Sequence, residues 1–145
     1  MASLKRGFKF AKRGLTLAVK RERNVRVHLT VAGIVLICAL LGRVEAWAWA
    51  CIILCCGLVL AAEFLNTALE TLCDRVHPGI DQRIRDCKDI AAGGVLICAV
   101  ISVAVGGVVF LRPHVLAELA KRPFELAVLA LITPALLYLL RSVKK

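Results

Sequence analysis

IAAGGVLICAVISVAVGGVVFL (residues 90–111) runs for 22 residues without a charged side chain. A helix of about 20 mostly apolar residues is long enough to cross the hydrocarbon core of a bilayer, so this segment predicts a transmembrane helix. Three shorter uncharged runs lie at residues 29–42, 46–62 and 126–140. They reach a spanning length only when polar residues at their ends are included. We therefore expect an all-α integral membrane protein.

The composition of the whole chain agrees with this expectation. Of its 145 residues 60% are hydrophobic, and the mean hydropathy is +0.81. Soluble domains hold only about 45–50% apolar residues. A cleaved signal peptide is not expected, because the first 28 residues carry nine Lys or Arg and no small-residue cleavage site follows an isolated apolar core.

The net charge is +10, and a strongly basic protein can be a nucleic-acid binder. Here the positive charge flanks the apolar runs, as the positive-inside rule describes for membrane proteins. Sixteen of the 20 basic residues fall within residues 1–28, 73–89 and 141–145. We expect these three segments on the cytoplasmic side of the membrane, and no nucleic-acid partner.

Apolar residues between positions 3 and 20 share one helical face, and lysines and arginines cover the rest. This pattern predicts an amphipathic helix that lies in the membrane interface, with a disordered basic tail as the alternative. In the last apolar segment Pro134 would remove a backbone donor and kink the helix, and we prefer a fourth span there over an interfacial helix. The expected spans are residues 27–42, 47–73 and 88–111, with a kinked fourth at 123–140.

Seven cysteines raise the question of a metal or redox site. Five of them lie inside apolar runs, where cysteine behaves as a small hydrophobic residue. Cys73 and Cys87 fall on the side expected to be cytoplasmic, where thiols stay reduced. Because no C-x-x-C pair occurs, neither a zinc site nor a disulfide is expected.

A stripe of polar residues follows the second apolar run. Glu63, Asn66, Glu70 and Asp74 are spaced by three or four residues, so on a helix they share one face. Glu63 ends the uncharged run, and a carboxylate deep in a bilayer costs about 2.5–3.5 kcal/mol on insertion scales. A helix end that emerges into water would explain Asp74 but not Glu63. We interpret the stripe as a functional site.

Two further charged clusters flank membrane segments. Lys88-Asp89 begins the third span, and Glu22 precedes the first. Both fall on the expected cytoplasmic side, where ATP is present. Mg²⁺ favours one or two carboxylates together with phosphate oxygens and water, so these groups suit Mg²⁺-phosphate chemistry. Neither a P-loop nor a dinucleotide-binding glycine motif is present in the sequence.

The segment Glu63-Phe-Leu-Asn-Thr-Ala-Leu-Glu70, followed by Asp74 and by Lys88-Asp89-Ile-Ala-Ala-Gly-Gly-Val-Leu96, resembles the prokaryotic diacylglycerol kinase family. Residues 22–28 are similar to the family's segment before its first span. The resemblance covers about residues 8–111. It implies three spans, a surface helix, a homotrimer, and active sites formed between protomers near the cytoplasmic interface.

The resemblance also implies a reaction and a role for each matched residue. The reaction is transfer of the γ-phosphate of ATP, with Mg²⁺, to the hydroxyl of a membrane lipid. Glu63 corresponds to the general base, and Glu22 and Glu70 correspond to the metal-binding carboxylates. The remaining matches are nucleotide contacts at Asn66, Asp74, Lys88 and Asp89, and lipid contacts at Arg26 and Ala92.

Two features depart from the diacylglycerol branch of the family. Ala92 stands where that branch tends to have serine, which resembles the undecaprenol kinase branch and favours undecaprenol over diacylglycerol as the substrate. Residues 114–145 have no counterpart in the short family members. We therefore divide the chain into a lipid kinase domain, residues 1–113, and a C-terminal extension, residues 114–145.

A small transporter or an assembly subunit is the alternative function. Glu63 and Glu70 would then line a path for ions or protons. Such a path needs ionisable groups through the depth of the membrane, whereas the acids here gather at one side. The sequence therefore favours the kinase.

Overall fold

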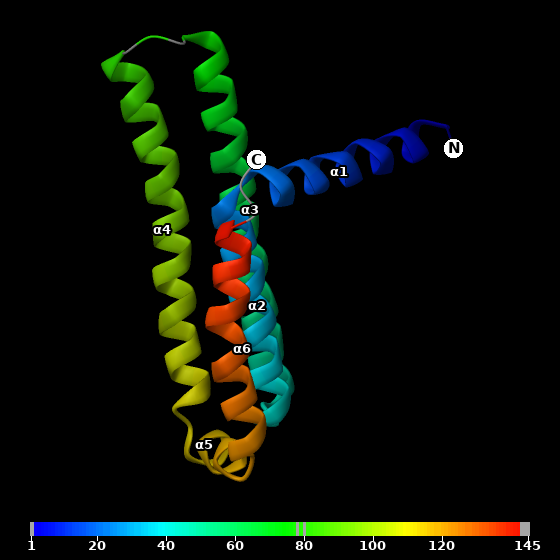
Figure 1. The fold of residues 1–145 in the computed structure, drawn as a ribbon, viewed down its shortest axis with the longest axis vertical. Coiled ribbons are helices and arrows are strands. Elements are labelled where there is room, and N and C mark those ends of the chain that lie inside the picture. Colours follow the sequence, from blue (N-terminus) through cyan, green and yellow to red (C-terminus); the bar gives the residue numbers. More distant parts are fainter. Residues whose placement is uncertain (1, 78, 80, 143–145) are drawn as a thin grey trace.

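The computed structural model describes residues 2–77, 79 and 81–142, and within them every regular element is a helix. Figure 1 shows long helices packed side by side, with one helix that projects away from the bundle. This arrangement confirms the predicted all-α class. The helices are α1 (Ala2–Arg21), α2 (Arg23–Leu41), α3 (Ala46–Val76), α4 (Gln82–Phe110), α5 (Pro113–Ala120) and α6 (Pro123–Ser142).

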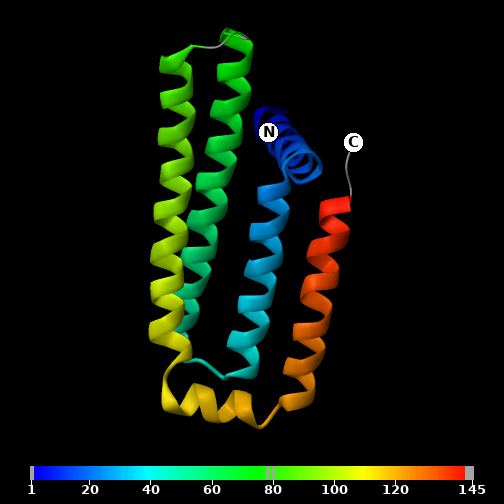
Figure 2. The ribbon, with the colours of Figure 1, turned by 60° about the vertical axis from the view of Figure 1, so that its left-hand side comes forward.

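Three of these helices, α2, α3 and α4, are long and apolar enough to cross a membrane, which confirms the three core spans. In α6, residues 123–136 form a shorter apolar helix. Figure 2 shows α6 running alongside α2, from α5 back toward the base of α1. The helix continues through Pro134. We call the two ends of the bundle the α1 end, which also carries the α3–α4 connection, and the α5 end.

The first helix leaves the bundle sideways at the α1 end (Figure 1). Its large apolar side chains are exposed, with Phe8 at 72% and Leu4 at 71%, as an amphipathic helix in a membrane interface requires. Only Glu22 separates α1 from α2, so the first long helix begins at Arg23 and not near residue 27. The sequence between the two helices is therefore a sharp corner rather than a linker.

The helix α4 begins earlier than its apolar sequence predicts. Asp81 is its N-cap: the carboxylate accepts hydrogen bonds from the backbone N–H groups of Arg83 at 2.7 Å and Ile84 at 3.4 Å. These bonds satisfy donors that a helix start leaves free. The charged residues 82–89 therefore form the first turns of α4, so the helix begins six residues before the span expected from residue 88.

The best-packed part of the molecule lies at the α5 end. Its core holds six buried side chains, five from α2, α3, α4 and α5 and one, Val44, from the connection between α2 and α3: Ala39, Val44, Ala48, Ile52, Val109 and Val115. The helix α5 was not predicted, because a proline shortly after an apolar run indicates only that the span before it ends. Pro113 occupies the first turn of α5, where its missing N–H costs nothing. Arg112 adds an ion pair to Glu45 at 2.5 Å across the same end.

Candidate active site

Two buried polar side chains stand out among the described residues, and both belong to α3. Glu63 is 2% exposed and Asn66 is 6% exposed. They continue a buried stripe that is apolar toward the α5 end, at Ala48, Ile52 and Val59. A buried charge is costly unless it is paired or coordinated. The change from apolar to polar along one stripe therefore favours a functional site over a packing feature.

Asn66 is coupled to Glu70, one turn further along α3. The side-chain Nδ2 of Asn66 donates a hydrogen bond to Oε1 of Glu70 at 2.9 Å. The Oδ1 of Asn66 is also buried, but it has no hydrogen-bond partner. Because nearly all buried polar atoms in proteins are paired, this free oxygen marks a position where a ligand can supply the partner. Glu70 itself is half-buried beside it.

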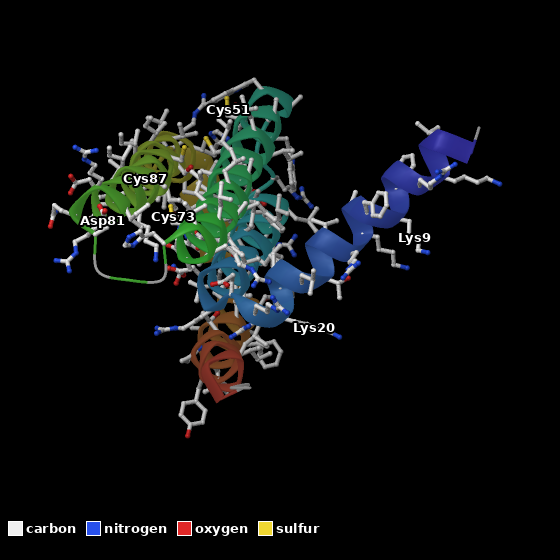
Figure 3. All side chains as sticks on the ribbon, turned by 90° about the horizontal axis from the view of Figure 1, so that it is seen from above. Lys9, Lys20, Cys51, Cys73, Asp81 and Cys87 are labelled. Atoms are coloured by element: carbon white, nitrogen blue, oxygen red, sulfur yellow. The ribbon has the colours of Figure 1, made fainter. Side chains whose placement is uncertain are left out.

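Asp74 and Lys88 form an ion pair that joins α3 to α4 at the α1 end. The Asp74 side chain is 68% exposed and that of Lys88 is 33% exposed. Cys73 and Cys87 lie near one another on the same two helices (Figure 3). Along the α3 stripe, exposure rises from buried Glu63 through half-buried Glu70 to open Asp74. The stripe therefore runs from the buried interior of the bundle to the exposed α1 end.

The corner between α1 and α2 lies alongside the half of α3 that carries this stripe (Figure 2). Glu22 sits at the corner and is half-buried. Arg26 donates from Nη1 to the carbonyl oxygens of Val19 and Lys20, each at 3.1 Å, and so satisfies carbonyls at the end of α1. The Nε of Arg26 is buried and has no hydrogen-bond partner. Arg26 therefore holds the corner and keeps one donor free.

The site can be tested for its fit to Mg²⁺. The described residues contain no group of three or more His, Cys, Asp or Glu placed to hold a metal ion, so Glu22, Glu63 and Glu70 do not form one within a single chain. Mg²⁺ needs only one or two carboxylates when a nucleotide supplies phosphate oxygens. The Glu70 carboxylate and the free Oδ1 of Asn66 are two oxygen donors of the required kind. The residues therefore fit a Mg²⁺ ion that arrives with a nucleotide.

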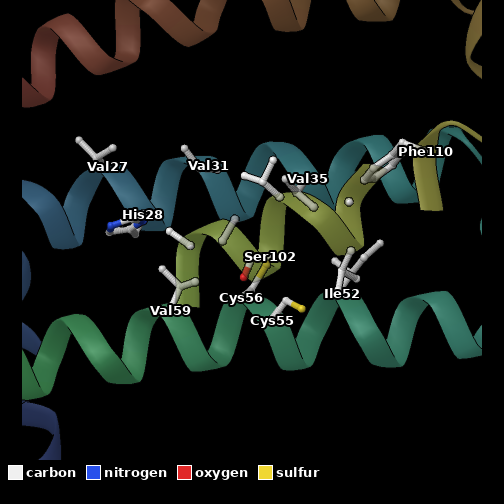
Figure 4. A pocket seen from close by; sticks show the side chains of 15 residues that line it. Val27, His28, Val31, Val35, Ile52, Cys55, Cys56, Val59, Ser102 and Phe110 are labelled. Carbon is white, nitrogen blue, oxygen red and sulfur yellow. The ribbon is translucent and has the colours of Figure 1, made fainter. Parts of the chain in front are cut away.

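An apolar cavity of about 350 Å³ lies among α2, α3 and α4. Figure 4 shows His28 toward one end of the cavity and Phe110 toward the other, with Val59 on the α3 wall. Glu63 follows Val59 by one helical turn on the same buried stripe. The cavity therefore approaches the polar site from within the bundle, as a pocket for an apolar tail would.

The cavity and the position of His28 on its wall were not predicted. The sequence pattern of one helix shows which of its faces is apolar, but not where three helices leave a gap between them. No signal in the sequence of α2 distinguishes a histidine that anchors the helix at the membrane interface from one that lines such a cavity. Conversely, Asp89 and Ala92 are exposed on α4 and lie outside the buried stripe of α3. One chain therefore brings together only part of the predicted site.

Comparison with known proteins gives consistent matches over most of the chain. The family model of prokaryotic diacylglycerol kinase matches residues 9–110. The chain is 38% identical over 107 residues to a diacylglycerol kinase of Synechocystis sp., a match that covers 73% of this chain and 61% of that protein. It is 36% identical over 106 residues to an undecaprenol kinase of Bacillus subtilis, which covers 73% of this chain and 86% of that protein. No solved structure gives a significant match.

The family match extends over all the predicted site residues, from Glu22 on the corner through the α3 stripe to Ala92 on α4. It ends at the last residue of α4, so α5 and α6 lie outside it. The family model matches about 70% of the chain, including the three long apolar helices and the polar stripe of α3. A match of this extent identifies the family. The chain belongs to the prokaryotic diacylglycerol kinase family.

Proposed function

We propose that this protein is a lipid kinase that transfers the γ-phosphate of ATP to the hydroxyl of a membrane lipid. The observation that carries the proposal is the buried carboxylate of Glu63, placed where an apolar stripe and cavity meet a polar path to the α1 end. Membership of a kinase family favours this function over transport or assembly. The gathering of the acids at one end of the bundle favours it too, since an ion path needs groups throughout the membrane.

In the proposed reaction the lipid tail occupies apolar space within the bundle, and the hydroxyl reaches the level of Glu63. Glu63 accepts the hydroxyl proton as the lipid oxygen attacks the γ-phosphorus of ATP. A new P–O bond forms to the lipid, the bond from the γ-phosphorus to the bridging oxygen breaks, and ADP leaves. Such a transfer asks the protein mainly for positioning and charge stabilisation. Burial of Glu63 keeps water away from the acceptor oxygen.

The other residues of the site act on the nucleotide. Glu70 and Glu22 would hold Mg²⁺, with the Oδ1 of Asn66 as a further oxygen donor. When bound, Mg²⁺ neutralises charge on the phosphate oxygens. Lys88 contributes a positive charge to the phosphates, and its ion pair with Asp74 holds it near the end of α3. Asp89, exposed one residue further along α4, contacts the nucleotide from the other side.

We also propose that the protein works as a homotrimer in the bacterial inner membrane. Within one chain the carboxylates of Glu22, Glu63 and Glu70 do not gather into a metal-binding group, and Asp89 faces solvent. Sites formed between protomers, as the family resemblance implies, would complete the set. The concentration of basic residues at the α1 end supports placing that end, with ATP, on the cytoplasmic side.

For the lipid acceptor we favour undecaprenol, which would give undecaprenyl phosphate, over diacylglycerol, which would give phosphatidic acid. Ala92 offers no hydroxyl to a glycerolipid ester. A polyprenol has one hydroxyl and an apolar tail, so it loses nothing at an alanine. A missing donor discriminates only modestly, and we expect a preference rather than exclusion. Ala92 remains our proposed contact to the acceptor lipid. Arg26 remains a proposed lipid contact, but it does not line the cavity among α2, α3 and α4.

The test uses purified protein in detergent micelles with radiolabelled ATP and Mg²⁺. Undecaprenol and diacylglycerol are supplied in separate reactions, and a mock preparation from cells that do not express the protein reports any kinase that co-purifies. We expect label in both lipids, with the faster rate for undecaprenol. A folded protein that labels neither lipid above the mock background would contradict the proposed function. A faster rate with diacylglycerol would contradict only the substrate preference.

A further inference from the structure

A second apolar groove lies on the other side of α2, away from the candidate active site. It has a volume of about 460 Å³, within the range of small-molecule sites, and it is formed by α2, α6 and the end of α1. Gly33 and Ile37 line it from α2, and Ile132 and Leu136 line it from α6. Because α6 lies beyond the family match, this groove is a feature of the present chain.

The groove is polar only at its α1 end. Thr30 and Thr133 also line it, but their hydroxyls donate to carbonyl oxygens of their own helices, at 2.9 Å to Arg26 and 2.6 Å to Leu129. The walls therefore offer no free hydroxyl proton to a ligand. Such walls suit a hydrocarbon chain and exclude a polar occupant from the depth of the groove.

Arg26 lies at the α1 end of the groove, beside Val19. Its guanidinium donates to two backbone carbonyls but forms no ion pair with any described carboxylate, and its Nε lacks a partner. A partly buried guanidinium needs an anion to balance its charge, and phosphate is the anion its planar donors match best. Lys20, exposed at the base of α1 (Figure 3), adds positive charge nearby.

The length of the groove fits one leaflet of a bilayer. From Arg26 to Ile37 the α2 wall rises by about 16 Å, at about 1.5 Å per residue, which is roughly half of a hydrocarbon core of about 30 Å. A lipid with its headgroup at Arg26 would therefore have a chain that ends near the middle of the membrane. An occupant from the leaflet at the α1 end is the one that this geometry accommodates.

The geometry points to a binding site for one phospholipid with an anionic headgroup, its phosphate at Arg26 and one acyl chain between α2 and α6. The site is separate from the cavity among α2, α3 and α4, and it does not depend on the proposed kinase activity. It gives the C-terminal extension a role: α6 supplies the second wall of the groove. The bound lipid in turn bridges α6 to the corner between α1 and α2.

The experiment compares two lipids and two matched variants. Delipidated full-length protein in a neutral detergent is titrated with phosphatidylglycerol or with phosphatidylcholine of the same acyl chains, and native mass spectrometry counts the bound lipids. Ile132→Trp fills the groove, whereas Leu131→Trp places the same side chain on the adjacent residue, which is 76% exposed and does not line the groove. Arg26→Gln removes the charge. Circular dichroism and thermal melting without lipid verify that each variant is folded.

We expect one phosphatidylglycerol per chain, bound about tenfold more tightly than phosphatidylcholine. Both lipids offer a phosphate to Arg26, but the choline ammonium of phosphatidylcholine cancels the negative charge of its headgroup and is repelled by Arg26 and Lys20. Ile132→Trp should lose most of this affinity, and Leu131→Trp should keep it within about twofold. Arg26→Gln should bind the two lipids equally. Equal binding of both lipids by the parent protein would contradict the proposed site. An equal loss of phosphatidylglycerol affinity in the two tryptophan variants would contradict it too.

Discussion

The carboxylate of Glu63 occupies a position where the pattern of α3 calls for an apolar side chain. Ile52, Val59 and Asn66 are spaced by seven residues on one buried stripe, and Glu63 lies between the last two. An amide of the same shape would fill this volume without carrying a charge into the bundle. The acid at this position therefore supports our proposal that Glu63 transfers a proton, which glutamine cannot do.

The first prediction is that Glu63→Gln lowers lipid phosphorylation by at least about 100-fold, the lower range for loss of a general base. Shape and burial are preserved, so melting temperature and ATP binding should stay close to those of the parent. Glu125→Gln is the matched control, because Glu125 is an exposed acid at the start of α6. Turnover of the Glu63→Gln variant within about threefold of the parent would remove Glu63 from the role of base.

The second prediction concerns the two carboxylates assigned to Mg²⁺. Glu70→Ala and Glu22→Ala should each raise the Mg²⁺ concentration needed for half-maximal turnover by about tenfold or more. Each substitution removes one of the two carboxylates proposed to bind Mg²⁺. Asp86→Ala serves as the control: Asp86 is an exposed acid near the start of α4 that accepts a hydrogen bond from Gln82 of the same helix. An unchanged Mg²⁺ dependence in either variant would exclude that residue as a ligand.

At the scale of the elements, hydropathy identified the three spanning helices because a bilayer imposes length and polarity on them. It did not place the start of α4, since charged residues continue a helix as readily as they form a loop. Asp81, followed by eleven residues without Gly or Pro, was the available signal for a helix cap. The helix α5 escaped notice because Pro113 both ends α4 and begins the next helix.

The same limit applies to the site. Spacing alone predicted the shared face of Glu63, Asn66, Glu70 and Asp74, because all four belong to one helix. The Asp74–Lys88 pair and the cavity with His28 depend on how α2 and α4 pack against α3, and no periodicity within a helix encodes that packing. The sequence therefore predicted which of these residues share a face of one helix, but not which residues of different helices contact one another.

The third prediction tests the tight contact between α5 and the corner after α2. A Cβ built on Gly42 would lie 2.8 Å from Cγ1 of Val115 and 3.1 Å from the carbonyl oxygen of Cys38. Gly42→Ala should therefore lower the free energy of unfolding in detergent by about 1–3 kcal/mol, the usual cost of overpacking. Gly57→Ala is the matched control, because nothing lies within 4 Å of its Cβ position. Equal melting temperatures for the two variants would show that α5 can move away from Gly42 without a loss of stability.

The fourth prediction separates two roles of the Asp74–Lys88 pair. As an exposed pair between α3 and α4 it should contribute little to stability, because solvent screens surface ion pairs. The charge swap Asp74→Lys with Lys88→Asp should restore that stability relative to either single variant. It should not restore the KM for ATP, because the swap moves the positive charge from α4 to α3. Recovery of the ATP KM in the double variant would mean that the pair is structural and does not act on the nucleotide.

At the scale of the whole molecule, packing and chemistry occupy opposite ends. The buried apolar cluster lies at the α5 end, and the half-open polar stripe lies at the α1 end, with the apolar cavity between them. A site that must admit a lipid and a nucleotide needs such an open end, and the tight end holds the helices in register. Changes at the two ends should therefore affect activity and stability separately.

The last prediction follows from this separation and concerns the C-terminal extension. Deletion of residues 123–145 removes α6 but leaves α5, whose Val115 is 1% exposed in the core of the α5 end. Deletion of residues 114–145 removes Val115 as well and uncovers Gly42 and Val44. Loss of one such valine costs roughly 1.5–3 kcal/mol of apolar burial. The longer deletion should therefore melt at a clearly lower temperature than the shorter one.

Turnover per folded molecule should respond differently. None of the residues proposed for catalysis lies beyond Ala92, so both truncated proteins should phosphorylate lipid within about threefold of the parent rate once the folded fraction is measured. Thermal melting monitored by circular dichroism supplies the folded fraction, and the radiolabel assay supplies the rate. A truncated protein that is folded but inactive would place part of the catalytic machinery in the extension. Equal melting temperatures would remove α5 from the stable core, because Val115 would then contribute nothing to it.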